Sequence, residues 1–295
     1  MEAEERPKGS ISPAANLGMV KLKVRDIERV RPFYEETLGF KVLHADEVNV
    51  QLGVEAERVL VWLQSDPQAP LRERGTVGLY HYAILMPGRS ELARVLQRLL
   101  DKNYPLQGAA DHYVSEAVYL ADPEGNGIEV YADRPRDAWY SPAGEMRMGT
   151  VALDVDDLLS SRAEGNDSAS ELPAGTRIGH IHLHVPDLEQ AIRVYRDIIG
   201  FDLMLRYGPS AGFLSAGGYH HHIGVNTWAG EGAPEPTAGS TGLLEYSVLV
   251  PDTTDLAAIE ARAVASGLDA QREDHALELK DPSGSRVVIQ SNQGE

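Results

Sequence analysis

Two stretches of the chain alternate apolar and polar residues and then change to helical spacing. One begins at Met19 (MVKLKVRDIERVRPFYEETLGFKVL), the other at His180 (HIHLHVPDLEQAIRVYRDIIGFDLM), and they align without a gap. The alternation predicts a strand with one apolar face. Asp26 and Asp187 then stand where a helix N-cap belongs, and the glycine of LGF or IGF marks the helix end. The two halves of the chain are therefore copies of one unit.

A second, fainter repeat lies inside each half. GLYHYAILMP from Gly78 matches GLLEYSVLVP from Gly242, and a helical stretch follows each of them. Both copies then reach an Asp-Pro turn, DPEGNGIEVY from Asp122 and DPSGSRVVIQ from Asp281, which predicts a hairpin leading into a final strand. Four strand-helix-strands modules are thus predicted, beginning near residues 18, 78, 178 and 242.

These repeats divide the chain into segments. We expect a disordered tail at 1–15, an N-terminal domain with modules one and two at 16–135, a linker at 136–176, and a C-terminal domain with modules three and four at 177–292. The first residues, MEAEERPKGSISPAAN, are polar and acidic and lack the apolar core of a secretory signal. This start indicates a cytoplasmic protein.

Composition narrows the chemistry. With 42% hydrophobic residues the chain is typical of a soluble globular protein, and no window approaches the roughly 20 apolar residues that cross a bilayer. The absence of cysteine excludes thiolate ligands, so a bound metal would need nitrogen and oxygen ligands. A net charge of −18 would repel nucleic acid and anionic lipid, and neither partner is expected.

Polar side chains interrupt two apolar strands. Glu129 lies in the run IEVY, and an inward carboxylate is costly to bury unless it is paired or bound to metal. His180, His182 and His184 share one strand face, where they could line a cavity or simply be solvated. A lone histidine on a strand is often a satisfied polar residue, so the pattern alone leaves the ligand role open.

With these landmarks, the sequence resembles the glyoxalase, bleomycin-resistance and extradiol-dioxygenase superfamily, also called the vicinal oxygen chelate superfamily. Within it, the likeness is to four-module catechol 2,3-dioxygenase-like ring-cleaving enzymes. The motifs on which this resemblance rests span nearly the whole chain: FYEETLGF and VYRDIIGF, GLYHYAILMP, HYVSEAVYLADPEGNGIEVYADRPRDAW, GHIHLHVPDLE, and GGYHHHIGVNTW. The resemblance implies an α+β fold in which four βαβββ modules form two curved-sheet cups. It also implies a divalent metal, namely Fe(II), Mn(II), Zn(II) or Ni(II).

The resemblance places metal ligands on the first and last strands of each module. His81, Glu129 and His180 occupy such positions, and two histidines with one carboxylate suit non-haem Fe(II). This set requires module two to pair with module three. Modules one and four would then form a second cup that holds no metal. The alternative joins modules three and four and uses His180, one of His220–His222, and Glu245.

The resembled enzymes also carry a tyrosine ten residues before the glutamate ligand and a histidine further upstream. Tyr119 fits this position, and His112 stands seven residues before it, a spacing slightly different from that of the family. In the run YHHHI, His220 and His222 share a face of a predicted strand. We expect one of them to enter the site as a general acid or base, or as a fourth ligand. Asn226 and Trp228 follow closely and could contact the substrate.

Three functions are open at this stage. The leading one is an Fe(II)-dependent extradiol dioxygenase that opens a catechol-type ring beside the diol. The alternatives are a metal-dependent glyoxalase-like lyase or isomerase, which a fourth ligand would favour, and a metal-free protein that sequesters a small aromatic drug. The expected partners are a small, neutral aromatic diol and O₂, and the chain could form a homodimer.

Overall fold

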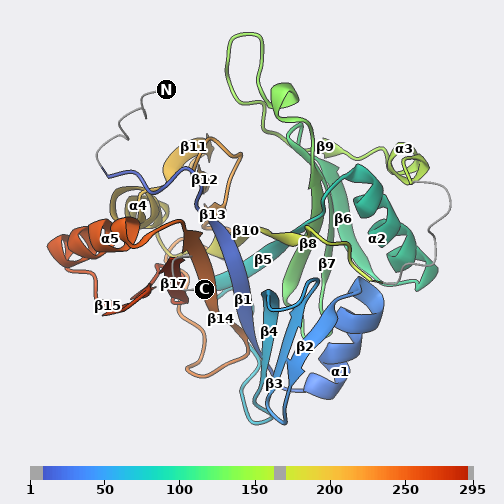
Figure 1. The fold of residues 1–295 in the computed structure, drawn as a ribbon, viewed down its shortest axis with the longest axis horizontal. Coiled ribbons are helices and arrows are strands. Elements are labelled where there is room, and N and C mark those ends of the chain that lie inside the picture. The colour runs from blue at the N-terminus through green and yellow to red at the C-terminus, as the bar shows by residue number, and fades with distance from the viewer. Residues whose placement is uncertain (1–8, 163–170, 292–295) are drawn as a thin grey trace.

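The computed structural model describes residues 9–162 and 171–291, which form two curved sheets flanked by helices (Figure 1). The first sheet contains β1 (Asn16–Val24), β2 (Lys41–Ala45), β3 (Asn49–Gly53), β4 (Val59–Ser65), β14 (Gly242–Val250), β15 (Ala270–Glu273), β16 (Ala276–Lys280) and β17 (Arg286–Ser291). The second contains β5 (Gly78–Leu85), β6 (Leu106–Asp111), β7 (Ser115–Ala121), β8 (Gly127–Asp133), β9 (Val151–Ala152), β10 (Arg177–His184), β11 (Asp202–Tyr207), β12 (Ala211–Ser215) and β13 (Ile223–Asn226). The α-helices are α1 (Ile27–Pro32), α2 (Arg89–Asp101), α3 (Val155–Ser160), α4 (Leu188–Arg193) and α5 (Thr253–Ser266).

Each sheet combines one module from each half of the chain. The strand orders are β15-β16-β17-β14-β1-β4-β3-β2 and β11-β12-β13-β10-β5-β8-β7-β6-β9. At the centre of each, the first strands of two modules pair antiparallel, β1 with β14 and β5 with β10. Module one therefore pairs with module four and module two with module three, the arrangement preferred from the sequence. The expected α+β fold of four βαβββ modules is confirmed.

The first helix of each half begins and ends as its sequence predicts. The Asp26 side chain accepts a hydrogen bond from the Arg29 backbone N–H at 3.1 Å, and Asp187 caps the corresponding helix in the second half. Both α-helices continue into π-helical turns, Phe33–Leu38 and Val194–Ile199. Those turns end at glycines with positive φ, 93° at Gly39 and 105° at Gly200, where a side chain would strain the backbone.

Parts of the predicted tail and linker contribute to the structure. Residues 1–8 and 163–170 lie outside the described residues. Of the remaining tail, Ile11 and Ala15 are buried, and the Ile11 N–H donates to the Gly200 carbonyl at 2.9 Å. The predicted linker carries a 3₁₀ turn (Arg136–Trp139) and α3, and its short strand β9 extends the second sheet beside β6. The segment between the halves thus helps to build the second sheet.

A buried cluster of two tyrosines and one aspartate recurs in each half and joins the two sheets. The members are Tyr34, Tyr82 and Asp122 in the first half, and Tyr195, Tyr246 and Asp281 in the second. Tyr195 belongs to module three, whereas Tyr246 and Asp281 belong to module four in the other sheet. The Tyr195 hydroxyl donates to Asp281 Oδ2 at 2.6 Å and lies 2.8 Å from the Tyr246 hydroxyl. Each half therefore ties one sheet to the other through a polar contact within the apolar core.

Replacing Tyr195 by phenylalanine should destabilise the fold. The change removes a hydroxyl that donates at 2.6 Å to Asp281, which is almost fully buried, and a buried acceptor that loses a partner costs about 1–3 kcal/mol. We expect this loss in the free energy of unfolding from urea titration. Tyr207→Phe is the control, because Tyr207 is 56% exposed, and it should change stability by less than about 0.5 kcal/mol. Equal stability of the two variants would show that the cluster does not hold the sheets together.

Candidate metal centre

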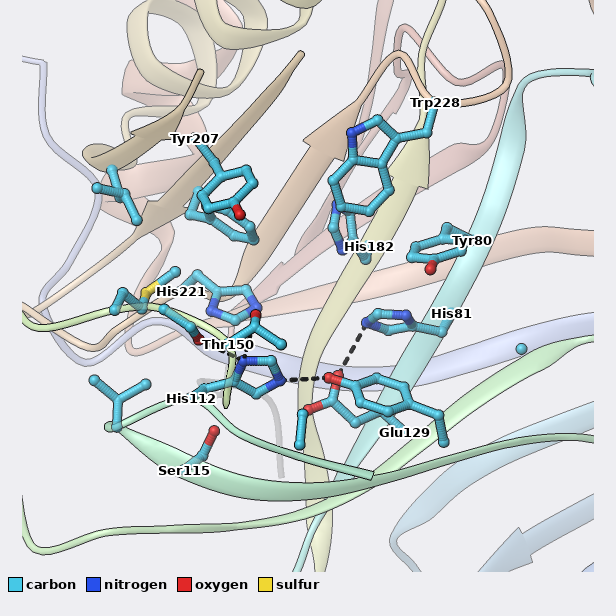
Figure 2. Close-up of a pocket in the computed structure, with 18 of the residues that line it drawn as sticks. Tyr80, His81, His112, Ser115, Glu129, Thr150, His182, Tyr207, His221 and Trp228 are labelled. Carbon is cyan, nitrogen blue, oxygen red and sulfur yellow. Dashed lines mark hydrogen bonds and ion pairs between the residues drawn. The ribbon is translucent and has the colours of Figure 1, made fainter. Parts of the chain in front are cut away.

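A cavity of about 480 Å³ opens on the second sheet, where modules two and three meet. Its lining includes both polar and aromatic side chains from β5, β7, β8 and β10, together with Trp228 after β13. Figure 2 shows His81 directed at Glu129 in this cavity, with Tyr80, His182 and Trp228 grouped beside them. The cavity is large enough for a small aromatic molecule and contains most of the side chains singled out in the sequence.

Three side chains from three adjacent strands converge beside the cavity, and two of them, His81 and Glu129, line it. His81 lies on β5, Glu129 on β8 and His180 on β10, and their possible ligand atoms lie within 4.8 Å of one another. Glu129 Oε2 is 3.0 Å from His180 Nε2 and 3.1 Å from His81 Nε2. The strand register explains the convergence, because Ala83 of β5 pairs with His180 on one side and Glu129 on the other. Ala83 is small, so it leaves the space between its two neighbours open.

Local backbone features aim His180 into this space. The pairing of β10 with β5 shifts register between Ile178 and His180, a bulge of the kind that redirects a side chain. Gly179 occupies the bulge, and a Cβ there would lie only 1.8 Å from the Tyr131 hydroxyl oxygen. Tyr131 in turn packs its ring 4.9 Å from the His180 ring, centroid to centroid. A side chain at residue 179 would therefore displace the aromatic support of His180.

The charges at this centre are set by burial and by mutual contact. Burial alone would raise the pKa of Glu129, but His180 and His81 outweigh it and hold that pKa well below the ordinary value. Burial lowers the pKa of His180 to about 4, in spite of the neighbouring carboxylate. At neutral pH the centre therefore combines an ionised Glu129 with a neutral His180. These are the protonation states in which carboxylate and imidazole bind metal.

The donor set fits a divalent metal. His81 Nε2 is buried and has no hydrogen-bond partner among the described residues, although it lies 3.1 Å from the Glu129 oxygen. A buried nitrogen without a partner costs free energy that a metal would recover. Two imidazoles and one carboxylate that face one point form the facial set found in non-haem Fe(II) sites, with open positions on the other side. His81, Glu129 and His180 are thus the residues that could hold the metal.

Tyr119 and His112 form a hydrogen-bonded pair beside this set. His112 Nε2 lies 2.7 Å from the Tyr119 hydroxyl, and His112 Nδ1 lies 2.8 Å from the Gly149 carbonyl oxygen. A carbonyl only accepts, so Nδ1 carries a proton, and in the tautomer protonated at Nδ1 alone the Nε2 atom accepts from Tyr119. Burial and then the charge of Glu129 hold the pKa of Tyr119 well above its ordinary value. The structure therefore brings both residues to the cavity.

The structure places the three consecutive histidines differently from the sequence expectation. His221 lines the cavity, its ring centroid 4.1 Å from that of His180, whereas His220 and His222 do not line it. His220 instead bonds through Nε2 to Asp133 at 2.9 Å, and His222 Nδ1 accepts from the Ala216 N–H. From the sequence, we expected His220 or His222, on a shared strand face, to enter the site. The correction has a simple cause: β13 begins only at Ile223, so strand alternation does not apply to these residues.

His182 and Trp228 are also cavity residues, whereas His184 and Asn226 bond to each other outside it. His182 is 4% exposed and its Nε2 has no partner within the described part of the chain. Tyr80 was not singled out in the sequence, although its place beside His81 could have suggested a role at the cavity rim. Its ring lies edge-on to both His182 and Trp228.

The alternative ligand set is not assembled. Glu245 lies on β14 in the first sheet, whereas His180 and the His220–His222 run belong to the second. The Glu245 carboxylate forms an ion pair with Arg286 of β17. Among the described residues, the one group of three or more side chains that could hold a metal is His81, Glu129 and His180. The site therefore bridges modules two and three.

Sequence comparison agrees with this architecture. The profile of the Glyoxalase/Bleomycin resistance protein/Dioxygenase superfamily matches residues 16–130 and 177–289, and the chain belongs to this family. Its two curved sheets have the vicinal oxygen chelate fold.

Individual relatives point in the same direction. Over 284 residues the chain is 44% identical to a catechol-2,3-dioxygenase of Bacillus subtilis, covering 95% of this chain and 99% of that protein. A biphenyl-2,3-diol 1,2-dioxygenase of Rhodococcus globerulus is 29% identical over 114 residues, or 38% of this chain and 60% of that protein. Among solved structures, glyoxalase I from Zea mays superimposes with a TM-score of 0.59 at 16% identity, covering 95% of this chain and 93% of that one. The last likeness concerns the fold alone.

Substituting His81 by alanine should impair metal binding without unfolding the protein. The change removes one of three ligands, and we expect the affinity for a divalent metal to fall by at least about a hundredfold, more than the loss of a supporting contact costs. The measurement is the metal content after dialysis against a weak chelator. His275→Ala serves as the control, because His275 is exposed and does not line the cavity. Equal metal retention by both variants would remove His81 from the ligand set.

Proposed function

We propose that this protein is an extradiol dioxygenase that uses Fe(II) to open the ring of a catechol-type aromatic beside its diol. The observation that carries the proposal is the open set of two histidines and one carboxylate, with the Tyr119–His112 pair in the same cavity. The 44% identity to a catechol-2,3-dioxygenase over nearly the full length of both chains supports it. In the reaction, the carbon–carbon bond next to the diol breaks and both atoms of O₂ enter the product.

The metal would be held by His81, Glu129 and His180, and would supply open positions for the diol oxygens and for O₂. The protein must then remove a proton from the diol. Tyr119 donates its own proton toward His112 Nε2, so the lone pairs of its oxygen are free to accept a hydrogen bond from a substrate hydroxyl. A proton taken up by Tyr119 can pass on to His112, whose Nδ1–H is held by the Gly149 carbonyl. The pair thus moves a proton away from the reacting ring.

The rest of the cavity orients a flat apolar ring and excludes water. Phe213, Trp228 and Tyr80 supply aromatic walls, and His182 and His221 are buried among them. Burial holds the pKa of both histidines well below the ordinary value, so they stay neutral at neutral pH and add no charge that would repel a metal. This favours a small neutral phenolic substrate. A cytoplasmic location and a homodimer remain predictions.

The test is metal analysis of protein purified without oxygen, followed by addition of Fe(II), O₂ and catechol. We expect stoichiometric iron, oxygen uptake, and a yellow ring-opened product, all lost in Glu129→Ala. Stoichiometric zinc or nickel without oxygen uptake on any catechol would replace the proposal by a glyoxalase-like lyase or isomerase. A protein that binds aromatic compounds but no metal would instead be a sequestering protein.

Removal of the Tyr119 hydroxyl should slow the reaction and leave the metal in place. In Tyr119→Phe the diol loses its first proton acceptor, and general acid–base groups contribute about 10²- to 10⁴-fold. We expect kcat to fall within that range, with iron content unchanged. Tyr113→Phe provides the matched control, because Tyr113 is partly exposed and its hydroxyl bonds to no other described residue. An unchanged kcat in Tyr119→Phe would mean that the proton leaves by another path.

A further inference from the structure

A second pocket lies where β10 begins. It measures about 160 Å³, against about 480 Å³ for the metal cavity. Arg177, the first residue of β10, lines it together with Arg136 from the segment between the halves, and with Tyr219 and His222. Its lining contains no aspartate or glutamate within the described part of the chain. The pocket is therefore cationic, although the protein carries a net charge of −18.

The two guanidinium groups are not neutralised by partners. Across residues 9–162 and 171–291, neither Arg136 nor Arg177 has a carboxylate within 4.0 Å. Arg136 donates one hydrogen bond to the Gly217 carbonyl, which carries no charge. Asp133 lies behind Tyr219 and is already bonded to that hydroxyl at 3.0 Å and to His220 Nε2 at 2.9 Å. One engaged carboxylate beside two arginines leaves a net positive charge.

His222 adds a neutral donor to the same lining. Its Nδ1 accepts from the Ala216 N–H at 3.2 Å, so the ring proton of the neutral imidazole resides on Nε2. Burial, and then the proximity of His220, lower the pKa of His222 to about 3. At neutral pH the positive charge of the pocket therefore comes from the two arginines, while His222 supplies an N–H.

We propose that this pocket binds a small oxyanion, a carboxylate or a phosphate, between Arg136 and Arg177. Guanidinium groups present paired N–H donors that match the oxygens of both ligands, and such charge-assisted hydrogen bonds are stronger than neutral ones. The pocket volume suits a compact anion rather than the aromatic substrate. This site is separate from the metal centre and does not depend on the proposed reaction.

The anion would contact residues 216–222, the segment that presents His221 to the metal cavity. Arg136 holds this segment at Gly217, and Tyr219 and His222 face the pocket. Between them, His220 Nδ1 lies 2.8 Å from His221 Nδ1, and His221 lines the metal cavity. Residues 216–222 therefore contribute side chains to both pockets, so a ligand in either pocket would contact this segment.

The test is calorimetric titration of the metal-loaded protein with inorganic phosphate, and separately with acetate, at constant ionic strength. The variant Arg177→Gln removes one guanidinium, and Arg193→Gln removes an equal charge at an exposed position of α4. We expect saturable binding of at least one anion to the wild type and to Arg193→Gln, and a Kd about tenfold higher in Arg177→Gln. The anion that binds more tightly identifies the class of ligand.

Two results would overturn the proposal. One is an equal Kd in Arg177→Gln and Arg193→Gln, which would place the anion elsewhere, for example on the metal. The other is a lack of saturable binding of either anion to the wild type at up to about 10 mM, a concentration that would detect even millimolar affinity. Arg177→Lys, which keeps the charge but loses the paired donors, should bind with an intermediate Kd. It replaces Arg177→Gln if circular dichroism shows that the latter is unfolded.

Discussion

The antiparallel pairing of β5 with β10 is the constraint on which the metal centre depends. It joins the first strands of modules two and three, so that His182 lies opposite His81 and His180 lies opposite Ala83. Because strand side chains alternate between faces, a slip of one residue would move every histidine of one strand to the other side of the sheet. Neither half of the chain contains all three candidate ligands, so the centre forms only when both halves fold together.

The first sheet repeats this geometry with different chemistry. There β1 pairs with β14, and Lys21 lies opposite Glu245 as His182 lies opposite His81. Glu245 is engaged by Arg286, and Val288 stands where the second module has Glu129. The scaffold depends on alternating apolar positions, which both sheets retain. The inward polar positions are free to differ. The second sheet therefore carries the candidate metal ligands, and the first carries an ion pair.

Sequence periodicity predicted the features that follow regular strands. Four modules and the two capped helices follow from alternation and repeats. The family resemblance, not the periodicity, implied His81, Glu129 and His180 as ligands, and this set required the pairing of modules two and three that the structure has. Periodicity could not place His220–His222, since Gly217 and Gly218 have φ values of 61° and 65° and the chain turns before β13. The partners of His220 and His222 come from distant or irregular segments, which no strand pattern encodes.

Burial sets the protonation states of the metal centre, and it also costs free energy. Glu129 is 3% exposed, and at neutral pH its neighbour His180 carries no compensating charge. Burial of the carboxylate costs free energy, which its contacts with His180 and His81 offset. A divalent cation offsets that cost and needs these protonation states, so metal affinity and fold stability should be coupled. The tyrosine–aspartate clusters that join the two sheets lie outside the centre, where they can stabilise the fold without occupying the ligand positions.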